Sequence, residues 1–308
     1  MFGEDETAKL NVGAAVREAC TEVGFFYIKN HFVDQNIISD TFIEAEGFFD
    51  ASIDVKMEVN IENSETLRGY TALLAAEHDD SGKDFHEGFD LALDLDSSDE
   101  DVKSGVFGYG PNQWPSGRDS FKSTLLNYHS SMVDFGKKIF ESFALALELP
   151  INHFEGAITK PMAHMRVLHY PPQDPKSGTE QMGIGAHSDY ECFTILCTSD
   201  VPALQVLNTD GVWIEAPPIE GAFIVNVGDL MARWTNDYFQ STVHRAINLS
   251  GRRRYSIPFF YGPNSKEIIE VLPSCQSDAI KAKYDPIEAG EYIKSRFDNT
   301  YAHRQEDE

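Results

Sequence analysis

The chain has 308 residues, 42% of them hydrophobic, and a formal net charge of −25 at pH 7. This length supports a sizeable hydrophobic core, and so acidic a surface repels nucleic-acid backbones and anionic membranes. We therefore expect no nucleic acid and no membrane among its partners, while the oligomeric state stays open.

The cysteines and the N-terminal residues bear on the cellular compartment. Four cysteines without a CxxC pair indicate reduced thiols, which are typical of the cytosol. The first residues lack the basic-then-apolar layout of a signal peptide, and no segment approaches the ~20 apolar residues of a membrane span. The prediction is a cytoplasmic protein.

The first half of the chain is expected to be rich in helices. Apolar residues at helical spacing predict a helix over 7–23, followed by a buried strand over 25–28 and a second helix over 34–50. The longest periodic segment, 119–148, advances its apolar residues by alternating steps of four and three. It predicts a long scaffold helix.

After about residue 160 the pattern changes to short β-rich runs separated by Gly, Pro, Asn and Asp. Such spacing is typical of a β-sandwich or barrel. The predicted strands are 166–170, 193–197, 203–207, 212–216, 222–227, 242–248 and 255–261, and helical propensity returns over 278–283 and 286–296. Because no repeat or linker divides the chain, we expect a single domain over 1–308, with a helix-rich part (1–150), a β core (160–262) and C-terminal helices (276–300).

A candidate metal site begins at His187 and Asp189. Alternate residues of a strand face the same way, so these two side chains share a face. The candidate third ligand is His244. Two imidazoles and one carboxylate form a facial triad that leaves coordination positions open, as in non-haem iron(II) oxygenases. The absence of thiolates argues against structural zinc, and a hydrolytic zinc would need a general base, for which we find no candidate.

Arg254 and Ser256 form a second pair with the same spacing. A guanidinium and a hydroxyl that project together into a barrel need an anion, and a carboxylate satisfies both. On the run 164–170, Arg166 and Tyr170 share one face with Leu168, and Met165 lies on the other. One of these two faces must point inward.

The sequence does not match the motifs of dinucleotide-binding, phosphate-binding or serine hydrolase sites. Gly183 and Gly185 begin like a dinucleotide fingerprint, but the sixth position is Ser188 and the segment that follows is predicted as a strand. No Walker loop and no GxSxG elbow occurs. Ser188 is then a spacer between two ligands, with its side chain directed away from the metal.

Together these motifs resemble the iron(II)- and 2-oxoglutarate-dependent oxygenases of the isopenicillin N synthase-like group. His187-Ser-Asp189, His244 and Arg254-Tyr-Ser256 occur in that family's order and at similar spacing, and the resemblance covers nearly the whole chain. Further similar stretches are Gly24-Phe-Phe-Tyr-Ile-Lys-Asn-His31, Met165-Arg-Val-Leu-His-Tyr-Pro-Pro172, Asn226-Val-Gly-Asp229 and Arg254-Tyr-Ser-Ile-Pro-Phe-Phe260. In one departure, members usually carry a short strand before the first helix, whereas this chain starts almost at that helix. Either the start is truncated or misassigned, or the core tolerates the missing edge strand.

The resemblance implies a mainly β fold with flanking helices, a double-stranded β-helix or distorted jelly roll. It implies that His187, Asp189 and His244 hold iron. Arg254 and Ser256 would bind the distal carboxylate of 2-oxoglutarate, with Tyr170 near the co-substrate. The substrate wall would be formed by Arg166, Tyr70, Phe89, Tyr190, Cys192 and Phe260.

The implied activity is that of a dioxygenase that uses Fe(II), 2-oxoglutarate and O2. It would hydroxylate, desaturate or cyclise a small metabolite of secondary metabolism and release succinate and CO2. Two alternatives of the same fold stay open: an oxidase without 2-oxoglutarate, in which Arg254 and Ser256 grip the substrate's own carboxylate, and an ethylene-forming type. A further alternative is a binding protein without turnover.

Overall fold

Seven antiparallel strands form the larger of the two main sheets in the computed structural model, which describes residues 5–75, 84–174 and 181–302. Three of the seven strands come from the N-terminal half of the chain, so both halves build one sheet. In spatial order the strands are β1 (Phe25–Lys29), β9 (Ala222–Val227), β6 (Phe193–Thr198), β11 (Arg254–Asn264), β4 (Pro161–Tyr170), β3 (Glu87–Leu91) and β2 (Gly69–Thr71).

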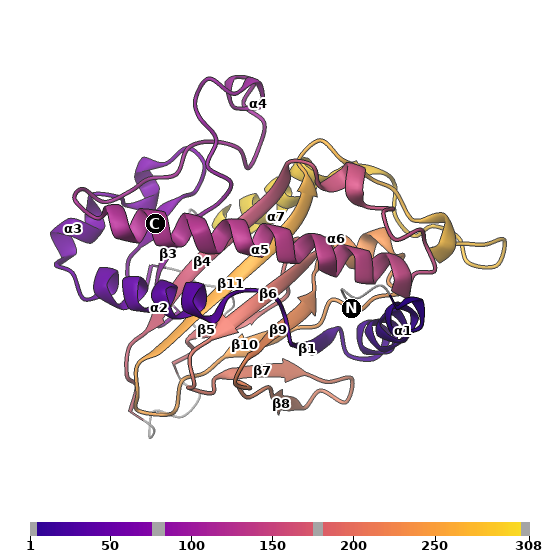
Figure 1. Cartoon of the computed structure of the whole chain (residues 1–308), viewed down its shortest axis with the longest axis horizontal. Coiled ribbons are helices and arrows are strands. Elements are labelled where there is room, and N and C mark those ends of the chain that lie inside the picture. Colours follow the sequence, from indigo (N-terminus) through magenta and orange to yellow (C-terminus); the bar gives the residue numbers. More distant parts are fainter. Residues whose placement is uncertain (1–4, 76–83, 175–180, 303–308) are drawn as a thin grey trace.

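Four strands form the smaller sheet, and it carries two of the candidate ligands. Its spatial order is β5 (Ile184–His187), β10 (His244–Ala246), β7 (Leu204–Leu207) and β8 (Trp213–Glu215). In the antiparallel register of β5 and β10, His244 lies directly opposite His187. The two antiparallel sheets with helices around them confirm the predicted mainly β class, a double-stranded β-helix with flanking helices (Figure 1).

Helices cover the outer face of the larger sheet. The long helix α5 (Asp119–Ala146) lies across this face and packs against α1 (Glu6–Glu22) and α2 (Gln35–Phe49) (Figure 1). Its apolar residues, spaced by four and three, are buried against the strands: Phe121, Leu125, Tyr128, Met132, Phe135 and Ile139. Residues on one helical stripe bury together, which is the pattern that predicts a scaffold helix.

Shorter elements complete the described part. They are α3 (Ile53–Met57), α4 (Glu100–Lys103), α6 (Asp229–Trp234), α7 (Ala289–Ala302), the 3₁₀ turns η1 (Ile61–Asn63), η2 (Glu155–Ile158) and η4 (Pro273–Cys275), and the two-stranded pair β12 (Ile268–Ile269) and β13 (Ile287–Glu288). The first four residues, where a leading strand is expected to be missing, lie outside the described residues. None of the helices described has the length and apolarity that a membrane span needs.

The predicted helix over 278–283 is wrong. This segment is irregular. Asn236, in the turn after α6, donates to the carbonyl of Lys281 and accepts from the amide of Lys283, while the amide of Ile280 donates to the hydroxyl of Ser277. The second predicted helix, 286–296, is shifted, since β13 precedes α7. Backbone groups satisfied by a distant side chain leave no signal in local periodicity.

Candidate metal centre

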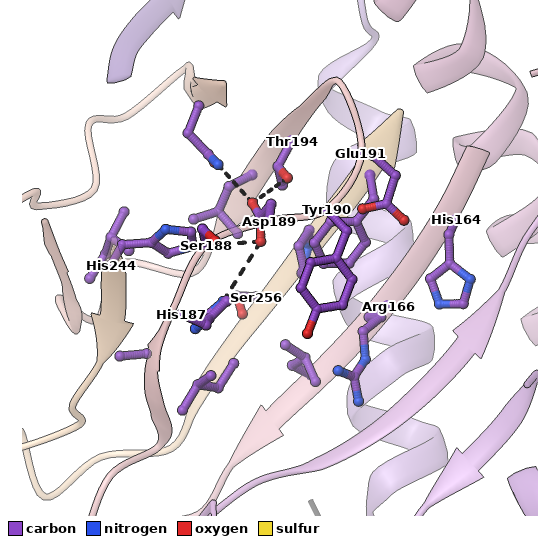
Figure 2. Close-up of a pocket in the computed structure, with 18 of the residues that line it drawn as sticks. His164, Arg166, His187, Ser188, Asp189, Tyr190, Glu191, Thr194, His244 and Ser256 are labelled. Carbon is purple, nitrogen blue, oxygen red and sulfur yellow. Dashed lines mark hydrogen bonds and ion pairs between the residues drawn. The ribbon is translucent and has the colours of Figure 1, made fainter. Parts of the chain in front are cut away.

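Two histidines and one aspartate converge at one end of the smaller sheet. β5 ends at His187, Asp189 lies in the turn that follows, and His244 begins β10. One atom from each side chain lies within 4.8 Å of the other two. Nε2 of each histidine is 3.7 Å from Oδ1 of Asp189 (Figure 2). The three predicted ligands therefore meet with a geometry that could hold one metal ion.

The outer nitrogens of both rings are engaged by the backbone. Nδ1 of His187 donates to the carbonyl of Gly185 at 2.8 Å, and Nδ1 of His244 donates to the carbonyl of Thr242 at 3.1 Å. These carbonyls fix the proton on Nδ1, so Nε2 offers its lone pair to the centre of the triad. Both imidazoles are thus oriented and in the tautomer that a metal ligand needs.

The carboxylate of Asp189 is held in the same way. Its Oδ2 accepts hydrogen bonds from Nδ2 of Asn226, at 2.7 Å, and from the hydroxyl of Thr194, which leaves Oδ1 facing the histidines. Burial alone would raise the pKa of Asp189, but the two histidines and these two hydrogen bonds bring that pKa below its ordinary value. Asp189 is therefore ionised, and its Oδ1 points toward the two histidines. A divalent metal fits this donor set of two imidazoles and one carboxylate.

Removing the hydroxyl that supports Asp189 should weaken the metal site. We expect Thr194→Val, which keeps the side-chain shape, to lower affinity for Fe(II) about 10- to 100-fold, the usual effect of losing an outer hydrogen bond to a ligand. Anaerobic calorimetry with Fe(II) measures this affinity. Thr124→Val, on the outer helix α5, is the control. Equal affinities in the two variants would show that Thr194 does not support the ligand.

Asp229, the first residue of α6, ties the two ligand-bearing segments together. Its Oδ2 accepts from the hydroxyl of Ser188 at 3.1 Å, and its Oδ1 accepts from the hydroxyl of Ser241 at 2.6 Å. Ser188 thus directs its hydroxyl to Asp229, as expected of a spacer. Because Ser241 lies three residues before His244, the carboxylate of Asp229 holds the segment that carries His244 close to the segment that carries His187 and Asp189.

Beside the triad lies a buried cation, the guanidinium of Arg254. Arg254, 2% exposed, begins β11 opposite Tyr170, and its guanidinium lies 4.5 Å from the centre of the Tyr170 ring. It donates to the hydroxyl of Ser256 at 3.3 Å, and that hydroxyl lies 3.4 Å from the Tyr170 hydroxyl. Among the described residues, no carboxylate pairs with Arg254, and its Nε has no hydrogen-bond partner. A buried charge of this kind needs an anion from a ligand.

The triad and Arg254 open into the same cavity, whose volume is ≈ 140 Å³. The face of β4 that carries Arg166, Leu168 and Tyr170 lines it, whereas Met165 and Val167 point into the hydrophobic core. This settles which face of β4 points inward. The cavity shares four residues with a larger neighbouring hollow of ≈ 830 Å³: Leu67, His164, Glu191 and Phe297.

The six residues predicted to form the substrate wall fall into two groups by their position in the structure. Arg166, Tyr190 and Phe260 line the cavity. Tyr70, Phe89 and Cys192 are buried in the hydrophobic core instead.

Strand parity explains why Phe89 and Tyr70 face the core. Phe89 lies opposite Val167 and so shares the core-facing side of the sheet, where it packs against Phe48. Tyr70, opposite Phe89 on β2, faces the same side. Cys192 is fully buried in the core, while the preceding Glu191 lines the cavity. An aromatic side chain in a sheet does not reveal from sequence which face it occupies.

Tyr70 belongs instead to a buried network around Glu87. Oε2 of Glu87 accepts from the Tyr70 hydroxyl at 2.6 Å and from Nζ of Lys56 at 2.7 Å, and Oε1 accepts from Nδ1 of His169 at 2.8 Å. Burial alone would raise the pKa of Glu87, but these three hydrogen bonds lower it to about 2. The network ties β3 to α3 and β4.

Breaking this network should destabilise the fold without affecting metal binding. Glu87→Gln leaves Lys56 buried without a counter-charge, and we expect a loss of about 3 kcal/mol, measured by denaturant unfolding. Because the folded pKa lies below the unfolded value, the stability that Glu87 contributes is present above pH 4.5 and is lost as pH falls toward 2. Glu22→Gln, at an exposed end of α1, is the control. A Glu87→Gln variant as stable as the control would contradict this account.

Several cavity residues were missed by sequence reasoning. Thr194 and Asn226 support Asp189, and Asp90, His164 and Glu191 line the cavity. Burial and the nearby Asp189 raise the pKa of Glu191 to about 8. His164 could have been found, since it shares strand parity with Arg166, and Asn226 lies in a stretch already noted for its similarity. Asp90 and Thr194 carry no local signal.

Comparison with known proteins agrees with this geometry. The family model described as the 2OG-Fe(II) oxygenase superfamily matches residues 161–263, and that described as the non-haem dioxygenase in morphine synthesis N-terminal matches residues 2–117. The chain is 33% identical to the 2-oxoglutarate-Fe(II) type oxidoreductase hxnY of Emericella nidulans, over 97% of this chain and 88% of that protein.

Two further proteins extend the comparison. Homoarginine-6-hydroxylase 2-ODD-233 of Oryza sativa subsp. japonica is 33% identical over 92% of this chain and 88% of its own. The crystal structure of Neurospora crassa T7H in complex with alpha-ketoglutarate (2-oxoglutarate) and thymine superposes with a TM-score of 0.86 and 29% identity. It covers 96% of this chain and 93% of that chain.

Proposed function

We propose, given that this chain belongs to the 2OG-Fe(II) oxygenase superfamily, that His187, Asp189 and His244 hold its iron and that Arg254 and Ser256 bind the distal carboxylate of 2-oxoglutarate. The protein is an iron(II)- and 2-oxoglutarate-dependent dioxygenase that oxidises a small organic metabolite and releases succinate and CO2. Bound iron supplies the oxidising chemistry, and the residues of the chain position the reactants around it.

The observation that carries the assignment of 2-oxoglutarate is the buried, unpaired Arg254. A carboxylate that met this guanidinium would gain charge-assisted hydrogen bonds in a dry site and could accept a further bond from Ser256. Tyr170, whose ring lies against the guanidinium, would bound the co-substrate on one side. Since the triad opens into the same cavity, a dicarboxylate anchored at Arg254 could reach the metal with its other end.

The substrate is proposed to lie at the end of the cavity lined by Arg166, Tyr190 and Phe260. T7H from Neurospora crassa binds thymine, and the rice relative is named for homoarginine hydroxylation, so small polar substrates are the range we propose here. A role in secondary metabolism is part of the proposal. We also propose that 1–308 acts as one cytoplasmic domain, in keeping with four unpaired cysteines in the described residues.

An activity assay tests the proposal. Iron-loaded protein is given 2-oxoglutarate, O2 and a panel of small metabolites, and succinate, volatile products and oxidised substrate are measured. Succinate formed in step with an oxidised substrate supports the dioxygenase. Ethylene without a second substrate would identify the ethylene-forming type, and substrate oxidation that does not consume 2-oxoglutarate would identify the oxidase. Binding without any product would identify a binding protein.

A further inference from the structure

The end of the cavity beyond the triad carries a cluster of three charged or titratable side chains from two neighbouring strands. Asp90 lies on β3 and Arg166 lies directly opposite it on β4, with His164 two residues earlier on the same strand. All three line the cavity. Figure 2 shows Arg166 and His164 on the same side as Tyr190 and away from His244. This cluster is separate from the metal ligands and from Arg254.

Only one of the two carboxylate oxygens of Asp90 has a partner among the described residues. Oδ1 lies 2.8 Å from Nε2 of His164 and 2.9 Å from Nε of Arg166. Oδ2 is buried and accepts no hydrogen bond from the described residues, and the Asp90 side chain is only 4% exposed. A buried carboxylate oxygen without a donor is costly to the fold. In a ligand cavity, such an oxygen is suited to accept an N–H from the ligand.

Arg166 supplies the complementary donor. Its Nε lies 2.9 Å from Oδ1 of Asp90, and an arginine carries further N–H donors on its two terminal nitrogens. An acceptor on Asp90 and donors on Arg166 therefore lie side by side on paired strands. A ligand with an N–H next to a carbonyl oxygen matches this arrangement.

The charges at this end favour a neutral ligand. The positive charge of Arg166 is compensated by Asp90 in the wall itself, and a second carboxyl group, that of Glu191, lines the same end. A substrate carboxylate would find no uncompensated cation there. A substrate cation would meet a carboxylate whose charge is already paired, so it would gain little over a neutral N–H.

The remaining walls are flat and aromatic. Tyr190 and Phe260 line this end, and the ring of Phe297 from α7 meets the Tyr190 ring edge to face, with 5.6 Å between their centres. Aromatic walls of this kind pack well against a planar ring. The hydrogen-bonding edge formed by Asp90 and Arg166 would then lie along one side of that ring.

From these contacts we propose that Asp90 and Arg166 together select a neutral planar ring that presents an N–H beside a carbonyl, that is, a cyclic amide. Asp90 is thus a specificity-determining residue: its Oδ2 accepts the ring N–H while Arg166 donates to the ring carbonyl. The inference rests on the proposed function, because it concerns the substrate of the same site.

Binding measurements on the complete enzyme test this. Protein loaded with Fe(II) and 2-oxoglutarate under anaerobic conditions is titrated calorimetrically with 2-pyridone and uracil, with 1-methyl-2-pyridone and 1,3-dimethyluracil, and with benzoate and benzamidine. We expect at least one cyclic amide to bind more tightly than benzoate and benzamidine. N-methylation, which removes the N–H, should weaken its binding about 10- to 100-fold, the usual effect of losing a hydrogen bond to a charged group.

A variant of Asp90 tests whether this residue accepts the ring N–H. Asp90→Asn places an N–H donor where the ring N–H must bind, so it should weaken binding of the cyclic amide by a similar factor while the absorbance of the complex of Fe(II) and 2-oxoglutarate is unchanged. Asp134→Asn, on the exposed face of α5, is the matched control. The inference is overturned if benzoate or benzamidine binds more tightly than every cyclic amide, if no cyclic amide binds, or if N-methylation has no effect on wild-type protein. Failure of the wild-type protein to bind Fe(II) and 2-oxoglutarate would instead refute the proposed function.

Discussion

Asp189→Ala should abolish iron binding and turnover. Asp189 is the only carboxylate of the triad, and its removal leaves two neutral imidazoles, which hold a divalent ion poorly. Loss of an outer hydrogen bond to a ligand costs about 10- to 100-fold in metal affinity, and loss of the ligand itself should exceed about 100-fold. Anaerobic calorimetry with Fe(II) and an assay of succinate formation measure the two effects.

The control for this variant is Asp200→Ala, which removes a carboxylate at the surface that pairs only with Arg252 among the described residues. It should bind Fe(II) as the unchanged protein does. Asp189 is also buried between two histidines and Asn226, so circular dichroism must show that the variant is folded. A folded Asp189→Ala protein with wild-type iron affinity would mean that the metal binds elsewhere.

The second large effect is expected for Arg254→Met. Methionine keeps an unbranched side chain against Tyr170 but removes the charge that we assign to the distal carboxylate of 2-oxoglutarate. A hydrogen bond to a charged group contributes roughly 1.5–3 kcal/mol, so the dissociation constant for 2-oxoglutarate should rise about 10- to 100-fold. Fe(II) affinity should stay the same, since Arg254 is not a ligand.

Two comparisons sharpen this prediction. Arg254→Lys keeps a positive charge and should recover part of the lost affinity, while Arg252→Met, at an exposed position paired with Asp200, should have no effect. Wild-type protein that binds no 2-oxoglutarate, together with weaker substrate binding in Arg254→Met, would assign Arg254 to the substrate's carboxylate. The protein would then be the oxidase of the same fold.

Sequence periodicity predicted the large elements because their own residues carry the signal. Helix α5 repeats its apolar residues over 28 positions, and β6, β9 and β11 are runs of β-branched and aromatic residues. The short strands β2 and β3 were missed: β2 has three residues, too few for an alternation to emerge, and β3 is buried along its whole length and so lacks a polar face. The segment 278–283 failed because Asn236, some 45 positions away, satisfies its backbone.

Some residues of the candidate site could be predicted from the sequence and others could not. His187 and Asp189 are close in sequence, and the spacing of Arg254 and Ser256 places both on one face of β11, so these residues could be proposed without a structure. The substrate wall depends on which face of β3 points inward. The pairing of β3 with β4 determines this orientation, so that Asp90 lines the cavity and Phe89 lies in the core. Neither residue reveals the orientation by its own type.

The most direct test of the central claim is an anaerobic absorbance titration with Fe(II) and 2-oxoglutarate. If the triad and Arg254 bind the two together, the wild-type protein develops a visible metal-to-ligand charge-transfer band, and Asp189→Ala and Arg254→Ala each weaken it. An iron-loaded, catalytically active protein that develops no such band on saturation with 2-oxoglutarate would contradict the account.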